Sequence, residues 1–334
     1  MKRPATFDIT MARYILKKKL SRQSHFPFVT MIEPLEACNL RCQGCGRIRE
    51  YEDVLDQRMS VDEAMAAVQS AGAPVVSVSG GEPLLYEHLD ELIRALVEDK
   101  RFIFLCTNGL LLEENLDLFK PSPYLAFVVH MDGTAKIHDQ VTGRPGAYDI
   151  AFSAIQEAIR RGFRVNTNTT IFHGSDVEDL HASFDRLKNI GIEGLMVSAG
   201  YAYEDVSEQE QFLQRQEAIR VFREVLDPSR KLPFYNNPLY LDFLRGNRTY
   251  DCAAWTTPTY TVRGWRLPCY LIADEHVDSI DPLLDPALWK RYGPGKDKRC
   301  ANCMIHSSFE GASILASFRR PWDLLKVALE EGRS

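Results

Sequence analysis

Three cysteines near the start of the chain have a spacing that suits metal binding. Cys38, Cys42 and Cys45 form the pattern C-x3-C-x2-C within one short loop. Thiolates are soft ligands that suit iron–sulfur clusters, and such clusters commonly take four of them. Three thiolates would leave one iron of a 4Fe–4S cluster open for a small molecule, whereas a structural zinc site takes four ligands and the sequence offers no fourth one nearby. The loop therefore predicts a catalytic 4Fe–4S cluster with one open iron.

Four more cysteines form a second group that is spaced like a set of ligands. Cys252 and Cys269 form the pattern C-x11-G-x4-C, and Cys300 and Cys303 form the pattern C-x2-C. Four thiolates can hold a closed 4Fe–4S cluster, and they can equally hold zinc. The third alternative is that these thiols are ordinary buried residues.

The eighth cysteine, Cys106, ends a strand-like run and belongs to neither group. Barrel enzymes place reactive groups at this end of a strand. A thiol S–H bond is weaker than an aliphatic C–H bond, so a carbon radical can take hydrogen from it. The alternative is a structural role, because free cysteine is among the most buried residue types. We predict that Cys106 is the catalytic hydrogen donor.

Other strand ends carry groups that could hold a charged small molecule. Gly80 and Gly81 would let the backbone approach a ligand closely, and Glu82 could accept a charge-assisted hydrogen bond from an ammonium group. Further along the chain, His306 and Glu310 are candidates to face the second cysteine group or the substrate. The remaining polar residues that we expect to contact a cofactor are Asn108, Asp132, Asn166 and Asn168.

The elements that must position these residues alternate between strand and helix from residue 28 onward. Such alternation indicates right-handed βαβ units around a parallel sheet. Six repeats predict an α/β fold, a partial (βα)6 barrel with its chemistry at the carboxyl ends of the strands. The first barrel helix should begin with a capping box at Ser60–Glu63. We expect strands at Phe28–Ile32, Pro74–Ser79, Phe102–Cys106, Leu125–His130, Arg164–Ile171 and Gly194–Ser198, and helices near 60–72, 86–98, 112–118, 148–161 and 176–190.

The alternation stops after a charged helix near 208–226, which predicts three regions along the chain. Residues Ile9–Leu20 could form a helix with a basic end at Lys17-Lys18-Lys19. Such a helix either packs on the barrel with a solvated basic end or lies at a membrane surface, attracted to anionic lipid headgroups. The three regions are an N-terminal helical extension (1–27), the barrel (28–226) and a small irregular cysteine-rich C-terminal domain (227–334).

The composition limits the class of protein. The 334 residues are 45% hydrophobic and 26% charged, as in soluble globular proteins, and the formal net charge of −6 argues against general nucleic-acid binding. Eight cysteines are too few for a disulfide scaffold, and their ligand-like spacing indicates metal binding in a reducing cytosol. The N-terminus lacks the apolar core of a signal peptide, and no apolar run approaches the ~20 residues that cross a bilayer. We expect a cytoplasmic protein, with peripheral contact at the inner face of the membrane as a further option.

The cysteine loop and the strand ends together resemble the radical S-adenosylmethionine (radical-SAM) enzymes. In this superfamily the open iron binds the amino and carboxylate groups of S-adenosylmethionine, and a GGEP motif like residues 80–83 holds the methionyl amino group. Residues 106–109 and 130–133 also resemble strand ends of the superfamily. The spacing of the second cysteine group resembles the auxiliary-cluster domains of extended members, which favours a second 4Fe–4S cluster over zinc.

The order of these pieces is similar to one family in particular, the hopanoid-associated radical-SAM enzymes or adenosylhopane (adenosyl hopene) synthases. The resemblance implies that a flavodoxin- or ferredoxin-like donor reduces the cluster and that S-adenosylmethionine is cleaved to methionine and a 5′-deoxyadenosyl radical. That radical adds to the terminal alkene of diploptene (hopene), and a thiol at the position of Cys106 quenches the tertiary radical to give adenosylhopane. The matching stretches are 31–35 with the cysteine loop, 72–77 leading into GGEP, 105–108, 198–204, 268–271 and 300–304.

Two other functions fit parts of the sequence. A radical-SAM enzyme that abstracts hydrogen from a peptide or another lipid would use the same cysteine loop. A peptide-recognition domain before the barrel would favour the peptide substrate, and only about 27 residues precede the first strand. The second alternative is an iron–sulfur electron carrier or sensor without turnover. The GGEP strand end argues against it, because a carrier needs neither an open iron nor a cofactor cradle.

Overall fold

Six parallel strands form a partial barrel, as the alternation predicts. The computed structural model describes residues 3–318, 320, 322–323 and 326–327. The six strands lie side by side in reverse chain order, and each pairs in parallel with the next. Each of their ends differs from the expected position by at most one residue. Their bounds are β1 (Val29–Ile32), β2 (Val75–Val78), β3 (Phe102–Thr107), β4 (Leu125–His130), β5 (Arg164–Ile171) and β6 (Gly194–Ala199).

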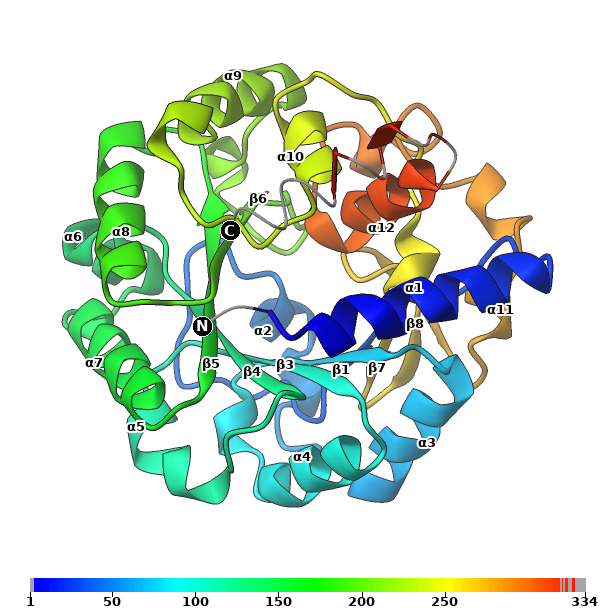
Figure 1. Cartoon of the computed structure of the whole chain (residues 1–334), viewed down its shortest axis with the longest axis horizontal. Coiled ribbons are helices and arrows are strands. Elements are labelled where there is room, and N and C mark those ends of the chain that lie inside the picture. The colour runs from blue at the N-terminus through cyan, green and yellow to red at the C-terminus, as the bar shows by residue number, and fades with distance from the viewer. Residues whose placement is uncertain (1–2, 319, 321, 324–325, 328–334) are drawn as a thin grey trace.

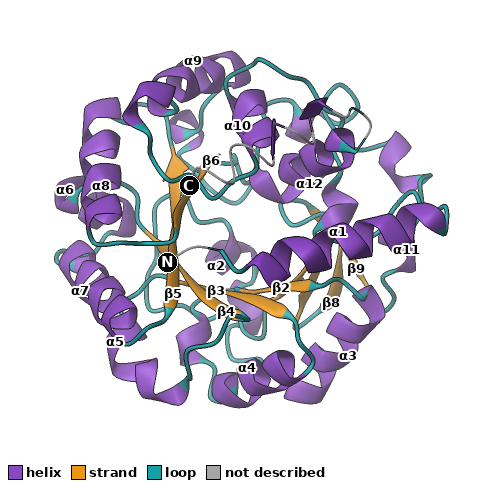
Figure 2. Ribbon diagram, viewed as in Figure 1, coloured by secondary structure: helices purple, strands orange, loops and turns teal. Residues whose placement is uncertain are grey.

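Helices cover the outer face of the sheet and form a ring around it (Figures 1 and 2). The first barrel helix begins with the expected capping box, in which the Glu63 amide donates to the Ser60 hydroxyl and the Ser60 amide donates to the Glu63 carboxylate at 2.8 Å. It ends at Gly72, whose φ of +64° is the left-handed conformation that favours glycine. The helices after the cysteine loop are α2 (Arg47–Glu50), α3 (Val61–Ala71), α4 (Leu89–Glu98), α5 (Leu112–Asn115), α6 (Ala135–Thr142), α7 (Ala147–Arg160), α8 (Val177–Asn189), α9 (Arg215–Val225), α10 (Pro238–Leu244), α11 (Asp281–Leu284) and α12 (His306–Ser317).

The C-terminal region continues the barrel sheet. Strand β7 (Thr259–Thr261) pairs in parallel with β1, and β8 (Gly264–Pro268) and β9 (Ala273–Val277) follow in antiparallel order. The sheet therefore has nine strands in the described chain, and β1 lies between β2 and β7. One cluster of buried apolar residues extends from the barrel into this region. The cysteine-rich region thus shares both a sheet and a core with the barrel.

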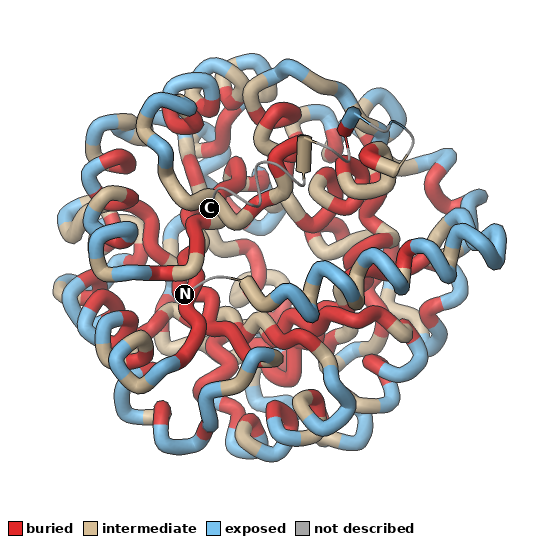
Figure 3. The backbone as a smooth tube through the Cα atoms, viewed as in Figure 1, coloured by how far each residue is buried: buried red, intermediate tan, exposed pale blue. Residues whose placement is uncertain are grey.

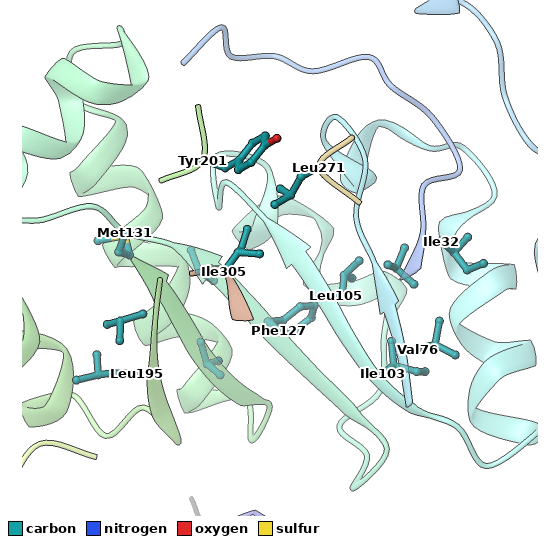
Figure 4. Packing of buried hydrophobic residues seen from close by; sticks show 14 of the residues in the cluster. Ile32, Val76, Ile103, Leu105, Phe127, Met131, Leu195, Tyr201, Leu271 and Ile305 are labelled. Carbon is teal, nitrogen blue, oxygen red and sulfur yellow. The ribbon is translucent and has the colours of Figure 1, made fainter. Parts of the chain in front are cut away.

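Buried apolar side chains fill the space between the strands and the surrounding helices, while the outer surfaces of the helices are exposed (Figure 3). Figure 4 shows Leu105 of β3 beside Phe127 of β4 and Ile103 of β3 beside Val76 of β2, and each of the four is at most 1% exposed. Successive residues of a strand face opposite sides. Phe104 and Cys106 therefore face the interior of the barrel, where both line a cavity.

The N-terminal helix α1 (Ala5–Leu20) crosses the end of the barrel at which the strands begin (Figure 1). The Phe7 ring lies 5.0 Å from the Phe102 ring, centroid to centroid, at the start of β3. The Tyr14 hydroxyl donates a hydrogen bond to the Pro27 carbonyl at 2.7 Å. The expected helix is confirmed and begins four residues before Ile9. Among the described residues, no helix combines the length and the apolar character needed to span a bilayer.

Candidate functional site

One large cavity, of about 690 Å³, lies inside the barrel. Cys38, Cys42 and Cys45 line it at the carboxyl ends of the strands, and Phe7 and Met11 of α1 line it at the opposite end. Its volume is within the usual range of pockets for small organic ligands. The three cysteines of the loop therefore share one space with the interior faces of the strands.

The three thiols of the cysteine loop are half-buried, and all three residues line the cavity. The Leu40 amide donates to the Cys38 sulfur at 3.4 Å, and the Asn108 side-chain amide donates to the same sulfur at 3.8 Å. Burial raises the pKa of Cys38 to about 11, and burial together with the neighbouring thiols raises the pKa of Cys42. Thiolates at Cys38 and Cys42 are therefore unfavourable here unless a positive group such as iron compensates their charge. The donor set fits the expected three-thiolate cluster.

The two glycines after β2 lie directly against the cysteine loop. A side-chain carbon on Gly80 would collide with the Leu35 carbonyl, and one on Gly81 would collide with the Ala37 carbonyl. The φ of Gly80 is +111°, which also favours glycine. The Gly81 amide donates to the Leu35 carbonyl at 3.1 Å. Glycine is therefore required at both positions because two backbone segments meet, and both residues line the cavity as expected.

The side chain of Glu82 is buried among hydrogen-bond donors of the chain itself. Its carboxylate is 1% exposed and accepts hydrogen bonds from the Thr107 hydroxyl at 2.8 Å, the Asn108 amide at 2.8 Å and the Leu84 amide at 3.0 Å. Burial raises the pKa of this carboxyl, and the three donors oppose the shift. Glu82 does not line the cavity and ties the end of β2 to the end of β3, and its expected contact with an ammonium group stays a prediction.

Two expected cofactor contacts, Asn108 and Asp132, do line the cavity. The Asn108 side chain donates to the Asn39 side chain at 2.7 Å, which joins β3 to the cysteine loop. The Asp132 carboxylate accepts from the Thr170 amide at 2.7 Å and lies 2.5 Å from Nε2 of His130. Burial alone would lower the pKa of His130, but the Asp132 carboxylate raises it above the ordinary value. The pair can therefore carry a proton at the cavity wall.

The polar face of β5 reaches the cavity only in part. Asn168 and Thr170 line the cavity, whereas Asn166 is fully buried and does not. Alternation places all three residues on one face of the strand, but Asn166 is nearer to the start of β5 and lies below the open space. The expected contact between Asn166 and a cofactor stays a prediction.

Cys106 lies at the cavity wall, as expected for a reactive thiol at a strand end. Its sulfur is 3.4 Å from the Ser77 hydroxyl on the adjacent strand β2. Burial raises the pKa of Cys106 to about 11, so that the thiol keeps its proton at neutral pH. An S–H group therefore faces the space that the cysteine loop also faces.

The four cysteines of the second group surround a small cavity of about 20 Å³. Burial raises the pKa of Cys252 to about 12 and that of Cys300 to about 11, and the other thiols of the group add to both shifts. The structure thus brings together two segments that are 48 residues apart, from Cys252 to Cys300. In the described part of the chain, no three His, Cys, Asp or Glu side chains stand close enough to share a single metal ion, so a metal in this group stays a prediction.

Helix α12 contributes polar residues to the barrel cavity. His306 and Glu310 both line it, and neither lines the small cavity between the four cysteines of the second group. The Glu310 carboxylate accepts from the Asn237 amide at 2.6 Å and from the Asn236 side chain at 3.2 Å. Burial lowers the pKa of His306 to about 4, so the imidazole is neutral at neutral pH.

One buried arginine behind the cysteine loop was not expected from the sequence. Arg47 is 4% exposed and forms an ion pair with Glu33, which is fully buried at the end of β1. The Arg47 guanidinium also lies 4.7 Å from the Tyr51 ring and 5.2 Å from the Tyr270 ring. Charged residues rarely occupy such positions without a partner. The only signal in the sequence was the position of Arg47, two residues after Cys45.

Two family models match the chain. Residues 32–187 match the model described as the Radical SAM superfamily, and residues 195–327 match a domain of unknown function, DUF3463. The second match begins within β6 and includes β7, β8 and β9. It therefore covers the last barrel strand together with the region that extends the sheet.

Several curated proteins are similar to parts of the chain. The Fe-coproporphyrin III synthase of Methanosarcina barkeri is 28% identical over 204 residues, which are 58% of this chain and 50% of that protein. The AdoMet-dependent heme synthase of the same organism is 30% identical over 159 residues, 46% of this chain and 45% of that protein. A probable GTP 3′,8-cyclase of Methanococcus vannielii is 27% identical over 259 residues, 74% of this chain and 86% of that protein. The chain spans about half the length of the first two relatives.

Solved structures resemble this one over most of the chain. Streptococcus suis SuiB bound to precursor peptide SuiA has a TM-score of 0.67 at 18% identity and covers 92% of this chain and 76% of its own. Native anSMEcpe with bound AdoMet and Kp18Cys peptide has a TM-score of 0.59 at 16% identity, covering 85% of this chain and 88% of its own. At such identities the likeness concerns the fold, and it confirms the predicted α/β architecture with an additional C-terminal region.

Proposed function

We propose that this chain, whose residues 32–187 are a domain of the radical SAM superfamily, is a radical-SAM transferase. It would join a 5′-deoxyadenosyl group to the terminal alkene of a polycyclic triterpene of the hopene type. The observation that carries the proposal is the position of Cys106, a protonated thiol on the wall of the cavity that the cysteine loop also lines. An enzyme that only abstracts hydrogen from its substrate has no need of such a donor.

The cofactors would be held at the carboxyl ends of the strands. Cys38, Cys42 and Cys45 would hold the 4Fe–4S cluster, which when bound supplies the electron that cleaves S-adenosylmethionine to methionine and a 5′-deoxyadenosyl radical. The backbone at Gly81 would approach S-adenosylmethionine, and Asn108 would bond its polar groups. Both residues already line the cavity beside the loop.

Cys106 would complete the reaction by giving a hydrogen atom to the product. Addition of the adenosyl carbon radical to the alkene forms one carbon–carbon bond, breaks the π bond and leaves an unpaired electron on the internal carbon. Transfer of the thiol hydrogen then forms a C–H bond and leaves a thiyl radical on Cys106. One electron and one proton restore the thiol, and the electron would come from a low-potential flavodoxin- or ferredoxin-like donor. Ser77, 3.4 Å from the sulfur, can orient the S–H group.

The rest of the cavity suits an apolar substrate. Phe104, Val128 and Met196 line its wall from three different strands, and Phe7 and Met11 line its far end. Such side chains exclude water, which would protect a radical from side reactions. A long apolar substrate could therefore extend from Cys106 toward α1.

The second cysteine group would hold a further 4Fe–4S cluster, with zinc as the lesser option. Tyr201 lines both the small cavity between these four cysteines and the large cavity of the barrel. Its ring centroid is 5.1 Å from that of Tyr203. A cluster in this group would therefore lie next to the reaction space, where it could transfer electrons or stabilise the fold.

An anaerobic product assay with S-adenosylmethionine, a reductant and diploptene tests the proposal. The wild-type enzyme should give a saturated adenosylated product, and in deuterated buffer this product should carry deuterium at the former internal alkene carbon. Cys106→Ala should still cleave S-adenosylmethionine and form the adduct, but with less saturated and more oxidised or rearranged product. Val128→Ala is the matched control, because Val128 lies beside Cys106 on the adjacent strand β4 and the change keeps both the thiol and its Ser77 partner, so it should still give the saturated product.

Two outcomes of this assay would contradict the proposal. If Cys106→Ala forms saturated adduct at the wild-type rate, another group donates the hydrogen. If the wild-type enzyme gives only free 5′-deoxyadenosine, with a burst that depends on added peptide or another lipid, the chain is instead an enzyme that abstracts hydrogen from that substrate.

A further inference from the structure

We propose that helix α1, at the end of the barrel opposite the cysteine loop, is the surface with which this protein docks on an anionic lipid bilayer. We further propose that the apolar substrate passes from the bilayer into the barrel cavity beside α1. The second statement rests on the proposed function, whereas the first can be tested without any turnover.

The outer face of α1 combines apolar and basic side chains. Ile9, Leu16 and Leu20 are 50%, 56% and 76% exposed, and they are among the most exposed large apolar residues that the structure describes. Their spacings of seven and four residues place them on one side of the helix. Successive helical residues are about 100° apart, so Lys17 and Lys19 lie on the two flanks of this apolar stripe. Helices that lie in a membrane interface have this arrangement.

The charge of this segment is opposite to that of the whole chain. The formal net charge of the chain is −6. A local positive charge on a negative protein provides attraction to an anionic surface and orients the molecule, with this end facing the membrane. Between residues 3 and 22 there are six basic residues and one acidic residue, namely Arg3, Arg13, Lys17, Lys18, Lys19 and Arg22 against Asp8.

The inner face of the same helix forms part of the cavity wall. Met11 and Ile15 line the cavity from α1, and Ile314 and Phe318 line it from the end of α12. Lys19 Nζ lies 4.7 Å from the centre of the Phe318 ring, so the two helices meet where the exposed stripe ends. One side of α1 therefore faces the reaction space while the opposite side is exposed.

Helix α1 packs on the barrel through a small core of its own. Ile15, Phe26 and Phe28 form a buried cluster that is separate from the main core, and Ile314 and Phe318 pack against it. This cluster is much smaller than the main core, so the half of α1 that carries Ile15 can open at less cost than a strand of the barrel. A hydrocarbon substrate could therefore pass between α1 and α12 without unfolding the sheet.

Vesicle binding tests the docking surface directly. The holoprotein should sediment with vesicles of phosphatidylcholine and phosphatidylglycerol, bind weakly to phosphatidylcholine alone, and be released by salt. Replacing Arg13 and Lys17 by Gln should lower the partition coefficient by about fivefold for each charge removed. Leu16→Glu combined with Leu20→Glu should lower it at least about tenfold. Ile150→Glu is the matched control, because Ile150 is 40% exposed on α7, away from this end, and it should bind like the wild type.

A second measurement examines the route of the substrate and separates the two proposals. With diploptene in vesicles, the Leu16→Glu/Leu20→Glu variant should lose most of its turnover, and with diploptene dispersed in detergent it should match the wild type. Neither residue lines the cavity, so the chemistry itself should be intact. Vesicle binding without an adenosylated product from either form of the alkene would overturn the proposed function and leave the docking surface standing.

Other outcomes would overturn the docking surface. If the wild-type protein binds neither kind of vesicle, the docking surface is excluded. It is also excluded if the Leu16→Glu/Leu20→Glu variant binds vesicles as well as the wild type does. If light scattering instead shows a dimer that these substitutions dissociate, the exposed face of α1 is a contact between two copies of this chain.

Discussion

Removing the Glu82 carboxylate should destabilise the fold before it affects any cofactor. Three donors converge on this buried group, from Thr107, Asn108 and Leu84. A buried donor without a partner costs about 1–3 kcal/mol, and three of them set an upper range of about 3–9 kcal/mol for Glu82→Ala. Burial raises the pKa of this carboxyl, so removing the charge returns part of that cost. We therefore expect a net loss near the lower limit, about 3 kcal/mol, and roughly half of that for Glu82→Gln, which keeps one acceptor oxygen.

Chemical denaturation of the metal-free protein under anaerobic conditions would measure this loss. Because no S-adenosylmethionine is present, a change in the unfolding midpoint reports only the hydrogen bonds within the chain. A constant slope with denaturant would show that the change lies in stability and not in the extent of unfolding. Glu87→Ala is the matched control, since the Glu87 side chain is 74% exposed in the same connection, and it should stay within about 0.5 kcal/mol of the wild type.

The opposite pattern would refute this reasoning. If Glu82→Ala unfolds at the wild-type midpoint and yet the loaded protein binds S-adenosylmethionine much more weakly, the carboxylate is a direct ligand. The three hydrogen bonds would then contribute nothing measurable to the joining of β2 and β3.

Four further predictions concern the cysteines. Replacing Cys38, Cys42 or Cys45 with Ala should abolish cleavage of S-adenosylmethionine in the anaerobic assay, and cleavage at the wild-type rate would exclude the variant residue as a required ligand. Protein that lacks all three of these cysteines should still contain iron, or zinc as the lesser option, after anaerobic reconstitution, whereas metal analysis that finds neither would exclude a site in the second group. Burial raises the pKa of Cys106 to about 11, above the ordinary value of about 8.5, so deuterium transfer to the product should be constant from about pH 7 to about pH 9.5. Between those two pKa values the Cys106 thiol keeps its proton in the folded state and has lost it in the unfolded state. The contribution of Cys106 to stability should therefore decline as pH rises. The Cys106→Ala variant should show a shallower decline of its denaturation midpoint with pH than the wild type.

The positions of the strands could be predicted from the sequence because the strands are short runs, rich in apolar or β-branched residues, between turn residues. The run at Leu125–His130 and the run at Arg164–Ile171 match their observed bounds. The capping box at Ser60 was equally predictable, because it depends on two residues in the same turn. The pairing of β7 with β1 was not, because Thr259–Thr261 is only three residues long and its partner is more than 200 positions away. Local patterns carry no signal for such a distant pairing.

The same limit applies to the site residues: local spacing could be predicted from the sequence, whereas contacts between distant strands could not. The spacing of Cys38, Cys42 and Cys45 is a local property, and all three line one cavity as expected. The sequence predicts that Asn166 lies on the polar face of β5. It does not show how far along the barrel axis Asn166 lies, and in the structure Asn166 does not line the cavity. The motif at Glu82 indicates a carboxylate near the site. It does not show that this carboxylate already accepts a hydrogen bond from a neighbouring amide, that of Asn108. Which group faces a ligand depends on contacts between strands that are far apart in the chain.

The position of β1 in the sheet has a consequence for the order in which the chain folds during synthesis. Strand β1 pairs with β2 early, but its second neighbour, β7, is made only when the ribosome reaches Thr259–Thr261. Until β7 is made, one edge of β1 has no partner strand and faces the solvent. The cysteine loop that follows β1 then lies beside a barrel that is still open at this edge. Domains fold largely as units as they emerge from the ribosome, so the barrel would complete its folding only after β7 is made. During this interval the three thiols of the loop would be open to the solvent, and the barrel beside them would close only when β7 pairs with β1.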